Sequence, residues 1–599
     1  MTKSFENLLF LVRQVGTNTA LRLLIAAGAL ATLDTVGVAV VFPYLTVISA
    51  APSNNMGPMV SRIKELVGVA SHIEFVIVIS VLLMGFFVLK FCLSYFFHRV
   101  RFHASAAITT TLSDQLIHLL LNADYGHLSN VSVAEATGVV NGETIHAVIC
   151  LDAWVTIATE ALFLLLILVA VIAINPHLAL ALVGMLAVVS LVLYVWILKA
   201  VAALGARQAA IHLRQYRFLH SIVSAIKDMK ILRLEEAVES EHQLLNNRYA
   251  KAVAAFNLYQ TLPRSVVELC IMLALLGACA LVLRAQVDIA AILPLVGFLA
   301  VSSLRVIPSY SRLIGSYNSF MYYEPSLALI KNLYESLSAR QVHISSKALP
   351  FAKNIEIRNV RFAHGTKRVL DDVSLVIPKG GSVGIVGLSG SGKTTFLDVL
   401  AGLRRADQGE FLIDGVPFDP FQSDSLRRLL GYVPQNVTLV DDTIAFNIAF
   451  EETWDDRRLR RAAQIARIEH VIDALPGGFT ALVGEGGVRL SGGQKQRIGI
   501  ARALYQTPEI LIFDEATSAL DNLTERELTD EIAALAGDKT IIVVAHRLSS
   551  IIRCDVIYLF DEGRIAGRGT HSELLSASPA YRLLYHGTAE AGHRATAIT

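Results

Sequence analysis

Apolar residues are concentrated in the first half of the chain. Nearly all of the long uncharged runs lie before residue 312, and the remainder alternates between short apolar runs and polar segments. A helix that spans a bilayer needs about 20 mostly apolar residues. Six segments meet or approach that length, so we predict six transmembrane helices. They lie at about 22–48, 75–97, 151–174, 178–198, 264–284 and 289–311.

Basic residues in the connections orient these helices. Lys3, Arg13 and Arg22 precede the first span, and the long connections 99–150 and 207–264 are rich in Lys and Arg. Because such residues stay on the cytoplasmic side, we predict a cytoplasmic N-terminus and a cytoplasmic location for everything after the sixth span. A cleaved signal peptide is the alternative for the first span, but its apolar run exceeds the roughly 7–15 residues usual for one.

Three connecting segments carry patterns of their own. Residues 58–69 predict a short amphipathic helix outside the membrane, which either caps the first helical pair or has a functional role. Residues 124–131 and 228–236 predict short crossing helices at the cytoplasmic ends, where they would contact the second half of the chain. Ordinary loop turns are the alternative for both.

Composition agrees with a membrane protein. The chain is 54% hydrophobic and 17% charged, with a mean hydropathy of +0.53, which is unusual for a soluble protein. A net charge of +1 gives no reason to expect a nucleic-acid partner. The five cysteines lack metal-ligand spacing, so we expect buried thiols.

A polar, irregular stretch at 339–352 divides the chain and is predicted to be a linker. Before it, residues 1–338 form the predicted helical transmembrane domain. After it, residues 353–586 alternate strand-like and helix-like patterns, which predicts an α/β domain. Residues 587–599 are small and polar, and we expect a disordered tail.

A glycine-rich loop follows the strand-like run 381–386 in the second domain. Its sequence fits the P-loop pattern, in which backbone N–H groups and a helix N-terminus cradle phosphates. We predict that Lys393 neutralises the β- and γ-phosphates of ATP and that Thr394 coordinates Mg²⁺. The predicted nucleotide-binding residues of the loop are Gly387, Ser389, Gly390, Ser391, Gly392, Lys393, Thr394 and Thr395.

Two carboxylates end the apolar run 510–513. Asp514 suits the Mg²⁺ shell, and Glu515 suits the general base that activates water. The alternative is a pair of solvated surface acids. His546 follows the strand-like run 541–545, where it would either orient the attacking water against the γ-phosphate or be an ordinary loop histidine.

Leu490-Ser491-Gly492-Gly493-Gln494 combines a hydroxyl, two glycines and a helix start. In this order after the P-loop it resembles the signature loop of ABC-transporter ATPases, and the resemblance covers essentially the whole chain. The resemblance implies that Ser491 and Gly493 contact the γ-phosphate bound by the other subunit. It also implies nucleotide contacts by Gly492 and Gln494.

The resemblance implies further roles. Gln435 would join Mg²⁺ and catalysis to movement of the membrane domain, Asp521 would lie at the dimer interface, and Glu485 would contact the crossing helices. His364 stands where the family usually has a tyrosine that stacks on adenine. Since the chain has one ATP-binding domain and each site needs two, the implied unit is a homodimer that works by alternating access.

The membrane half resembles PglK-type flippases, which translocate lipid-linked oligosaccharides. This resemblance implies an inner (plasma) membrane location in a bacterium and a polyprenyl-pyrophosphate cargo moved to the outer leaflet. The matching basic positions are Lys90, Arg264, Arg305 and Arg312. The alternative is an exporter of lipids, peptides or drugs whose cations are structural, and less plausible still is a membrane-anchored regulatory ATPase.

These four cations have a second interpretation that comes from the residues alone. A charge at membrane depth costs about 2.5–3.5 kcal/mol on insertion scales, so each cation needs an anionic ligand, a headgroup or an internal acid. The candidate internal acids are Asp34, Asp152, Glu160 and Glu268. We expect Asp152 and Glu160, inside the third span, to face protein or water.

Overall fold

The computed structural model describes most of the chain, in two compact units. The described residues are 2–40, 44, 47–48, 72–129, 131–174, 176, 184, 187–191, 197, 199–284, 289–341, 345, 349–516, 530, 537–545 and 548–585. One unit comprises residues 1–123 and 128–341, and the other comprises residues 124–127 and 342–599. Most of the predicted fourth span, the predicted helix 58–69, Asp521, His546 and the tail 587–599 lie outside the described residues.

The first unit is helical. Three of its helices have 50 residues each, so each is about 75 Å long, more than twice the thickness of the hydrocarbon core. They therefore extend well beyond a bilayer. Its elements are α1 (Thr2–Val15), α2 (Thr17–Ala39), α5 (His72–Leu121), α7 (Val133–Gly138), η1 (Val139–Glu143), α8 (Thr144–Ile174), α10 (Lys199–Ser224), α11 (Ile226–Leu232), α12 (Glu235–Arg284) and α13 (Ile289–Ser338).

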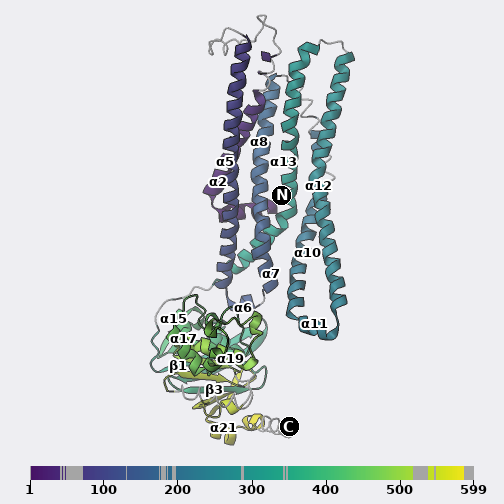
Figure 1. Ribbon diagram of the computed structural model, residues 1–599. Helices are drawn as coiled ribbons and strands as arrows, with labels where there is room; N and C mark the ends of the chain where they lie inside the picture. The colour runs from purple at the N-terminus through teal and green to yellow at the C-terminus, as the bar shows by residue number, and fades with distance from the viewer. Residues whose placement is uncertain are drawn as a thin grey trace. The chain divides into compact units, whose positions relative to one another are not determined.

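The long helices run side by side, with α8 packed on both α2 and α13 (Figure 1). Within the described part of the chain, three helices are long and apolar enough to cross a membrane: Thr17–Ala39, Ile73–Leu121 and Val133–Ala173. Helices α12 and α13 cover the predicted fifth and sixth spans. The count of six spans stays a prediction.

Small residues set the closest approaches between these helices. A Cβ added to Gly205 of α10 would lie 2.2 Å from the carbonyl oxygen of Tyr322 on α13, which only glycine permits. The core between α2, α8 and α13 is apolar. Its buried members are Ala31, Val38, Phe163, Ile167, Val171 and Val306.

One turn between α7 and α8 is a π-helix, η1, which contains the buried Glu143. The two carboxylate oxygens of Glu143 take separate partners: His146 Nδ1 lies 2.9 Å from one, and His212 Nδ1 on α10 lies 3.1 Å from the other. The π turn thus directs an acid toward a neighbouring helix.

The second unit contains two sheets. A four-stranded antiparallel sheet has the order β2-β1-β4-β5, and a six-stranded sheet has the order β10-β9-β3-β8-β7-β6, parallel except for β10. Their bounds are β1 Asn354–His364, β2 Lys367–Pro378, β3 Ser382–Gly387, β4 Gln408–Ile413, β5 Val416–Phe418, β6 Leu430–Val433, β7 Ile510–Asp514, β8 Thr540–Val544, β9 Val556–Asp561 and β10 Arg564–Gly569.

Helices complete this α/β unit. All residues of β7 and β8 are buried, the pattern of parallel strands covered on both faces. The helices are α14 (Lys393–Leu400), α15 (Asp424–Leu429), α16 (Ile444–Ala449), α17 (Asp456–Ile465), α18 (Glu469–Asp473), α19 (Gly492–Tyr505) and α21 (His571–Ala577), with short 3₁₀ turns between some of them. The predicted helical domain and α/β domain are both present.

The predicted short crossing helices also occur. Helix α6 (Tyr125–Leu128) falls within 124–131, and residues 124–127 group with the α/β unit, where the guanidinium of Arg404 lies 5.9 Å from the ring centre of Tyr125. Helix α11 begins two residues before the predicted start at 228 and ends at Leu232, because its C-cap Arg233 has a φ of 55°, and residues 235–236 of the predicted range begin α12.

Candidate functional site

The glycine-rich loop joins β3 to α14, and its backbone requires glycine. A Cβ on Gly387 would lie 2.2 Å from the carbonyl oxygen of Phe560 and 2.7 Å from Ser391 Oγ. Gly390 and Gly392 have φ values of +80° and +101°, which side chains disfavour. The sequence therefore builds a tight loop directly before a helix N-terminus.

The loop surrounds a buried ammonium group. Lys393 Nζ donates to the carbonyl oxygens of Gly387 at 2.8 Å and Leu388 at 3.0 Å. Burial lowers the pKa of the Lys393 side chain, and the nearby carboxylates Glu515 and Asp514 oppose that shift. The ammonium is thus held inside the loop, with only backbone oxygens as hydrogen-bond acceptors among the described residues.

The loop also contains an unsatisfied hydroxyl. Ser391 Oγ is buried and has no hydrogen-bond partner among the described residues. Ser389 and Thr394 are exposed, and Thr395 is half-buried. A buried hydroxyl without a partner costs free energy, and a phosphate oxygen is a partner of suitable size and charge. The residues present therefore fit a nucleotide phosphate.

Asp514 ends β7 and is buried beside Tyr432 of β6, whose hydroxyl donates to Asp514 Oδ2 at 2.9 Å. Burial raises the pKa of Asp514, and the carboxylates of Glu515 and Asp398 add to this, while Tyr432 and Lys393 oppose it. The sequence analysis gave Tyr432 no role. Its only signal was its position three residues before Gln435 in the same short segment.

Glu515 and Gln435 come together. Gln435 Nε2 donates to Glu515 Oε2 at 2.7 Å, although the two residues lie in separate loops after β6 and β7. Glu515 has a φ of 49°, an uncommon conformation for a residue with a side chain, and its N–H donates to the carbonyl oxygen of Val544. The edge where these parallel strands end thus gathers Asp514, Glu515 and Gln435.

The Ser-Gly-Gly-Gln segment starts α19, as the sequence predicts. Ser491 is the N-cap: its hydroxyl accepts from the N–H of Gln494, and the Gln494 side chain accepts from the N–H of Ser491. Ser491 and Gly492 are exposed, and Gly493 and Gln494 are half-buried. This capping box fixes the loop and leaves the hydroxyl proton of Ser491 available.

His364 ends β1 and is exposed. Its ring stands edge-on to Phe362, with the ring centres 5.0 Å apart and the planes at 89°. Gly365, with a φ of +60°, turns the chain into β2. The imidazole is therefore displayed at a hairpin tip, and stacking on adenine stays a prediction. The predictions for Asp521 and His546 also stay untested, because both residues lie outside the described part of the chain.

The four predicted cargo-binding cations are all paired with acids of the helical unit. Lys90 Nζ lies 2.8 Å from Asp34, Arg305 also pairs with Asp34, Arg312 Nε lies 2.5 Å from Glu160, and Arg264 Nε lies 2.8 Å from Glu268. The internal pairing that we gave as the alternative is thus the arrangement in this structure. Binding of cargo by these residues stays a prediction.

The acids of the predicted third span face protein. Asp152 pairs with Arg101 at 2.5 Å, and Glu160 is buried against Arg312. Arg101 donates further to the carbonyl oxygen of Asp152 and to Thr156. Both acids therefore have cationic partners, as charges in an apolar region require.

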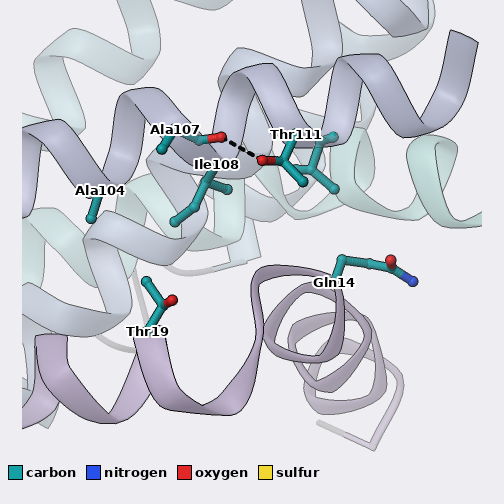
Figure 2. A pocket seen from close by; sticks show the side chains of 7 residues that line it. Gln14, Thr19, Ala104, Ala107, Ile108 and Thr111 are labelled. Carbon is teal, nitrogen blue, oxygen red and sulfur yellow. Dashed lines mark hydrogen bonds between the residues drawn. The ribbon is translucent and has the colours of Figure 1, made fainter.

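A cavity of about 150 Å³ lies between α1, α2 and α5 (Figure 2). The hydroxyl of Thr111 donates a hydrogen bond to the carbonyl oxygen of Ala107 at 2.8 Å. The remaining polar lining comes from Gln14 and Thr19, and no lining residue is charged. The full lining is Gln14, Thr19, Ala104, Ala107, Ile108, Thr111 and Leu112. None of the lining residues therefore has a titratable side chain.

Comparison with known families accounts for both units. Residues 24–304 match the model described as the ABC transporter transmembrane region, and residues 370–518 match the model described as ABC transporter. The chain belongs to the ABC transporter family. This ABC transporter fuses a transmembrane region to an ATP-binding domain, which confirms the predicted fold class, and its transmembrane region makes it an integral membrane protein.

Curated relatives of this ABC transporter include lipid flippases. It is 43% identical over 243 residues to the "ATP-dependent lipid A-core flippase" of Bordetella avium, covering 40% of this chain and 41% of that protein. It is 42% identical over 243 residues to "ABC transporter B family member 6" of Dictyostelium discoideum, covering 39% and 36%. These alignments thus span about two-fifths of each relative.

A solved structure extends the similarity to nearly the whole chain. A bacterial Atm1-family ABC exporter with ATP bound has a TM-score of 0.75, with 96% of this chain and 98% of that chain covered. The sequence identity is 24%, so this likeness concerns the fold alone.

Proposed function

We propose that this chain is an ATP-driven transporter that acts as a homodimer by alternating access. Its cargo would be a lipid-linked oligosaccharide of the polyprenyl-pyrophosphate type, or a related anionic amphiphile, moved from the cytoplasmic to the outer leaflet. The single observation that supports it most is a nucleotide-type loop with a buried ammonium and a buried hydroxyl that has no partner in the described part of the chain, which also has a transmembrane region.

In this proposal the loop from Gly387 to Thr395 holds the phosphates of ATP. Lys393 would exchange its backbone acceptors for phosphate oxygens, and the Ser391 hydroxyl would gain a partner, which it does not find among the residues that the structure describes. Thr394, Asp514 and Gln435 would hold Mg²⁺, which neutralises charge on the phosphates when bound. His364 would stack on adenine.

Glu515 would act as the general base. Gln435 already holds its carboxylate at 2.7 Å, which orients it at the carboxyl end of β7. A positioned base of this kind contributes about 10²–10⁴-fold to a rate. His546 would hold the attacking water against the γ-phosphate.

The homodimer completes each site. Ser491, Gly492, Gly493 and Gln494 of one subunit would face the phosphates held by the P-loop of its partner, with Asp521 at the interface. The exposure of Ser491 and Gly492 supports this, because a group that contacts a partner must be accessible in the single chain. ATP binding would close the two domains, and hydrolysis would reopen them.

We infer a bacterial inner (plasma) membrane location, with the N-terminus and ATP-binding domain in the cytoplasm. The relatives named as lipid A-core flippases favour a lipid cargo in general and make a lipid A-type glycolipid the second candidate. The cations Lys90, Arg264, Arg305 and Arg312 are the basis for an anionic headgroup.

The test is reconstitution in liposomes. We expect ATP-dependent flipping of labelled polyprenyl-pyrophosphate oligosaccharide, with Glu515→Gln abolishing both flipping and ATP hydrolysis while retaining ATP binding. Labelled lipid A-core is the second arm. Flipping of lipid A-core alone would replace the proposed cargo, and hydrolysis without flipping of either lipid would favour the regulatory ATPase.

A further inference from the structure

One buried carboxylate in the helical unit holds two cations. Asp34 of α2 has 8% of its side chain exposed, and its two oxygens take separate partners: Lys90 of α5 on Oδ1 at 2.8 Å and Arg305 of α13 on Oδ2. Three helices therefore meet at one acid. An ionised carboxylate has about four lone-pair sites, so it can accept from both cations at once.

The neighbourhood carries an excess positive charge. Arg312 follows Arg305 by seven residues, about two turns, so both lie on the same face of α13, and Arg312 pairs with the buried Glu160 of α8. Three cations thus face two carboxylates. Each of Lys90, Asp34, Arg305, Arg312 and Glu160 lies in or at the end of an apolar span, where an unbalanced charge is costly.

The cations and the acids differ in accessibility. Asp34 and Glu160 are each 8% exposed at the side chain, whereas Arg305 is 31% and Arg312 is 41% exposed. An anion from outside the cluster would therefore reach the guanidinium groups first. The Nε of Arg305 is buried without a hydrogen-bond partner among the described residues, and its Cζ lies 5.2 Å from the ring centre of Phe163.

The backbone makes room for this arrangement. A Cβ on Gly37, one turn after Asp34 on α2, would lie 3.2 Å from Lys90 Nζ. A side chain at this position would crowd the ammonium against the carboxylate. Glycine at this position thus leaves room for the Lys90 ammonium beside Asp34.

We propose that Asp34 is an internal counter-ion that an anionic headgroup displaces from Arg305. Asp34 would keep Lys90, and Arg305 would turn its planar donor fork to phosphate oxygens, which it binds in a bidentate manner. The exchange gives every cation one anion, and it makes Asp34 a positioning residue that sets the affinity for cargo. This rests on the proposed transport of an anionic amphiphile.

The test is direct binding without ATP. The full-length protein in phosphatidylcholine nanodiscs is titrated with farnesyl pyrophosphate, with farnesol as the uncharged control and inorganic pyrophosphate as the tail-free control. We expect Asp34→Asn to tighten farnesyl pyrophosphate binding about tenfold, or about 1.4 kcal/mol, because the competing carboxylate is gone. Farnesol binding should not change.

Three further variants separate the effect of competition by Asp34 from the effect of total charge. Asp34→Asn with Lys90→Gln has the same net charge as the wild type, so tighter binding in this pair assigns the effect to the release of Arg305. This double variant also buries one unpaired cation fewer than Asp34→Asn does, so it can fold even if Asp34→Asn alone unfolds. Asp34→Asn with Arg305→Gln should lose the gain, and Asp152→Asn, whose carboxylate pairs with Arg101, should bind as the wild type does.

The proposal is overturned if the charge-matched pair binds farnesyl pyrophosphate no more tightly than the wild type, or if Asp152→Asn shows an equal gain. A gain shared by inorganic pyrophosphate supports recognition of the headgroup by itself, and a gain limited to farnesyl pyrophosphate supports a lipid-borne headgroup. Failure of flipping in liposomes would reject the proposed function but leave these binding differences unaffected, so the two failures are distinguishable.

Discussion

Two buried aspartates, one in each unit, are stabilised in opposite ways. Asp514 of the ATP-binding unit accepts from a neutral phenol, Tyr432, on the adjacent strand, and burial raises its pKa. Asp34 of the helical unit is held between two cations from helices far apart in the chain. The first acid is set up to receive a cation, and the second already has more cations than it needs.

The difference follows from how each unit builds its polar groups. In the α/β unit, adjacent parallel strands end at one edge, so short loops bring Gln435 and Glu515 together through a hydrogen bond. In the helical unit, polar groups come singly from long apolar helices, and each must find its partner across a helix interface. The proposed Mg²⁺ site and the proposed site for an anionic headgroup differ in this respect.

The largest effect is expected when a buried acid of the helical unit is removed. Glu160→Gln leaves Arg312 without its counter-charge, and breaking a fully buried pair costs about 3–5 kcal/mol. Because Arg312 is 41% exposed, we expect a loss of about 2–4 kcal/mol in unfolding free energy, measured by thermal unfolding in detergent.

Glu241→Gln is its matched control. The pair of Arg214 on α10 and Glu241 on α12 also joins two helices of the same unit, but it is exposed on both sides and lies outside the predicted spans, so its loss should cost no more than about 1 kcal/mol. Equal destabilisation by the two substitutions would remove the distinction between structural and surface charges.

The next test concerns the backbone of the ATP-binding unit. Gly387→Ala places a Cβ 2.2 Å from the carbonyl oxygen of Phe560, and overpacking of this kind costs about 1–3 kcal/mol. We expect lower thermal stability of the unit together with weaker ATP binding, since the loop must shift. Gly492→Ala, whose Cβ meets nothing within 4 Å, should unfold as the wild type does. A stable Gly387→Ala variant would contradict the tight-loop argument.

The smallest effect should come from Tyr432→Phe. The lost hydroxyl removes a hydrogen bond that lowers the pKa of Asp514, so that pKa rises further. Because Mg²⁺ needs the ionised carboxylate, which is lost as pH falls through its pKa, Mg²⁺-dependent ATPase should decline at a higher pH in the variant. On the acidic side of the pH profile we expect the ATPase rate of the variant to be about 3–10-fold lower than that of the wild type. At higher pH the two rates should be nearly equal.

Tyr558→Phe is the control for this pH profile. Tyr558 is buried in the same sheet, but its hydroxyl donates to the carbonyl oxygen of Val376. The decline of its ATPase rate at low pH should match that of the wild type. A shift of equal size in both variants would assign the effect to general loosening of the sheet.

The ATP-binding unit was predictable because its signals are local. The glycines, Lys393 and Thr394 all lie within one short segment, 387–394. The strand before this segment and the helix after it follow directly from the pattern of apolar residues. Tyr432 was missed because a tyrosine on a strand reads as a packing residue, and only its neighbour across the sheet, Asp514, gives it a polar role.

In the helical unit, the sequence predicted the helices and the list of acids available to the cations, but not the pairing. Apolar length defines a helix without saying which neighbour it faces. Sharing of Asp34 by Lys90 and Arg305 depends on the packing of α2 against α5 and α13, and no spacing along the chain encodes it.

The π turn at η1 makes the exact number of residues in this part of the chain matter. A π turn holds about one residue more than an α turn, so deletion of Asn141 would convert the segment to regular α-helix and rotate everything before it by about 100°. Residues of α7 would then present a different face to α10, and Glu143 could no longer meet His146 and His212 together. In this segment, a change of length would disrupt the fold more than a change of side chain.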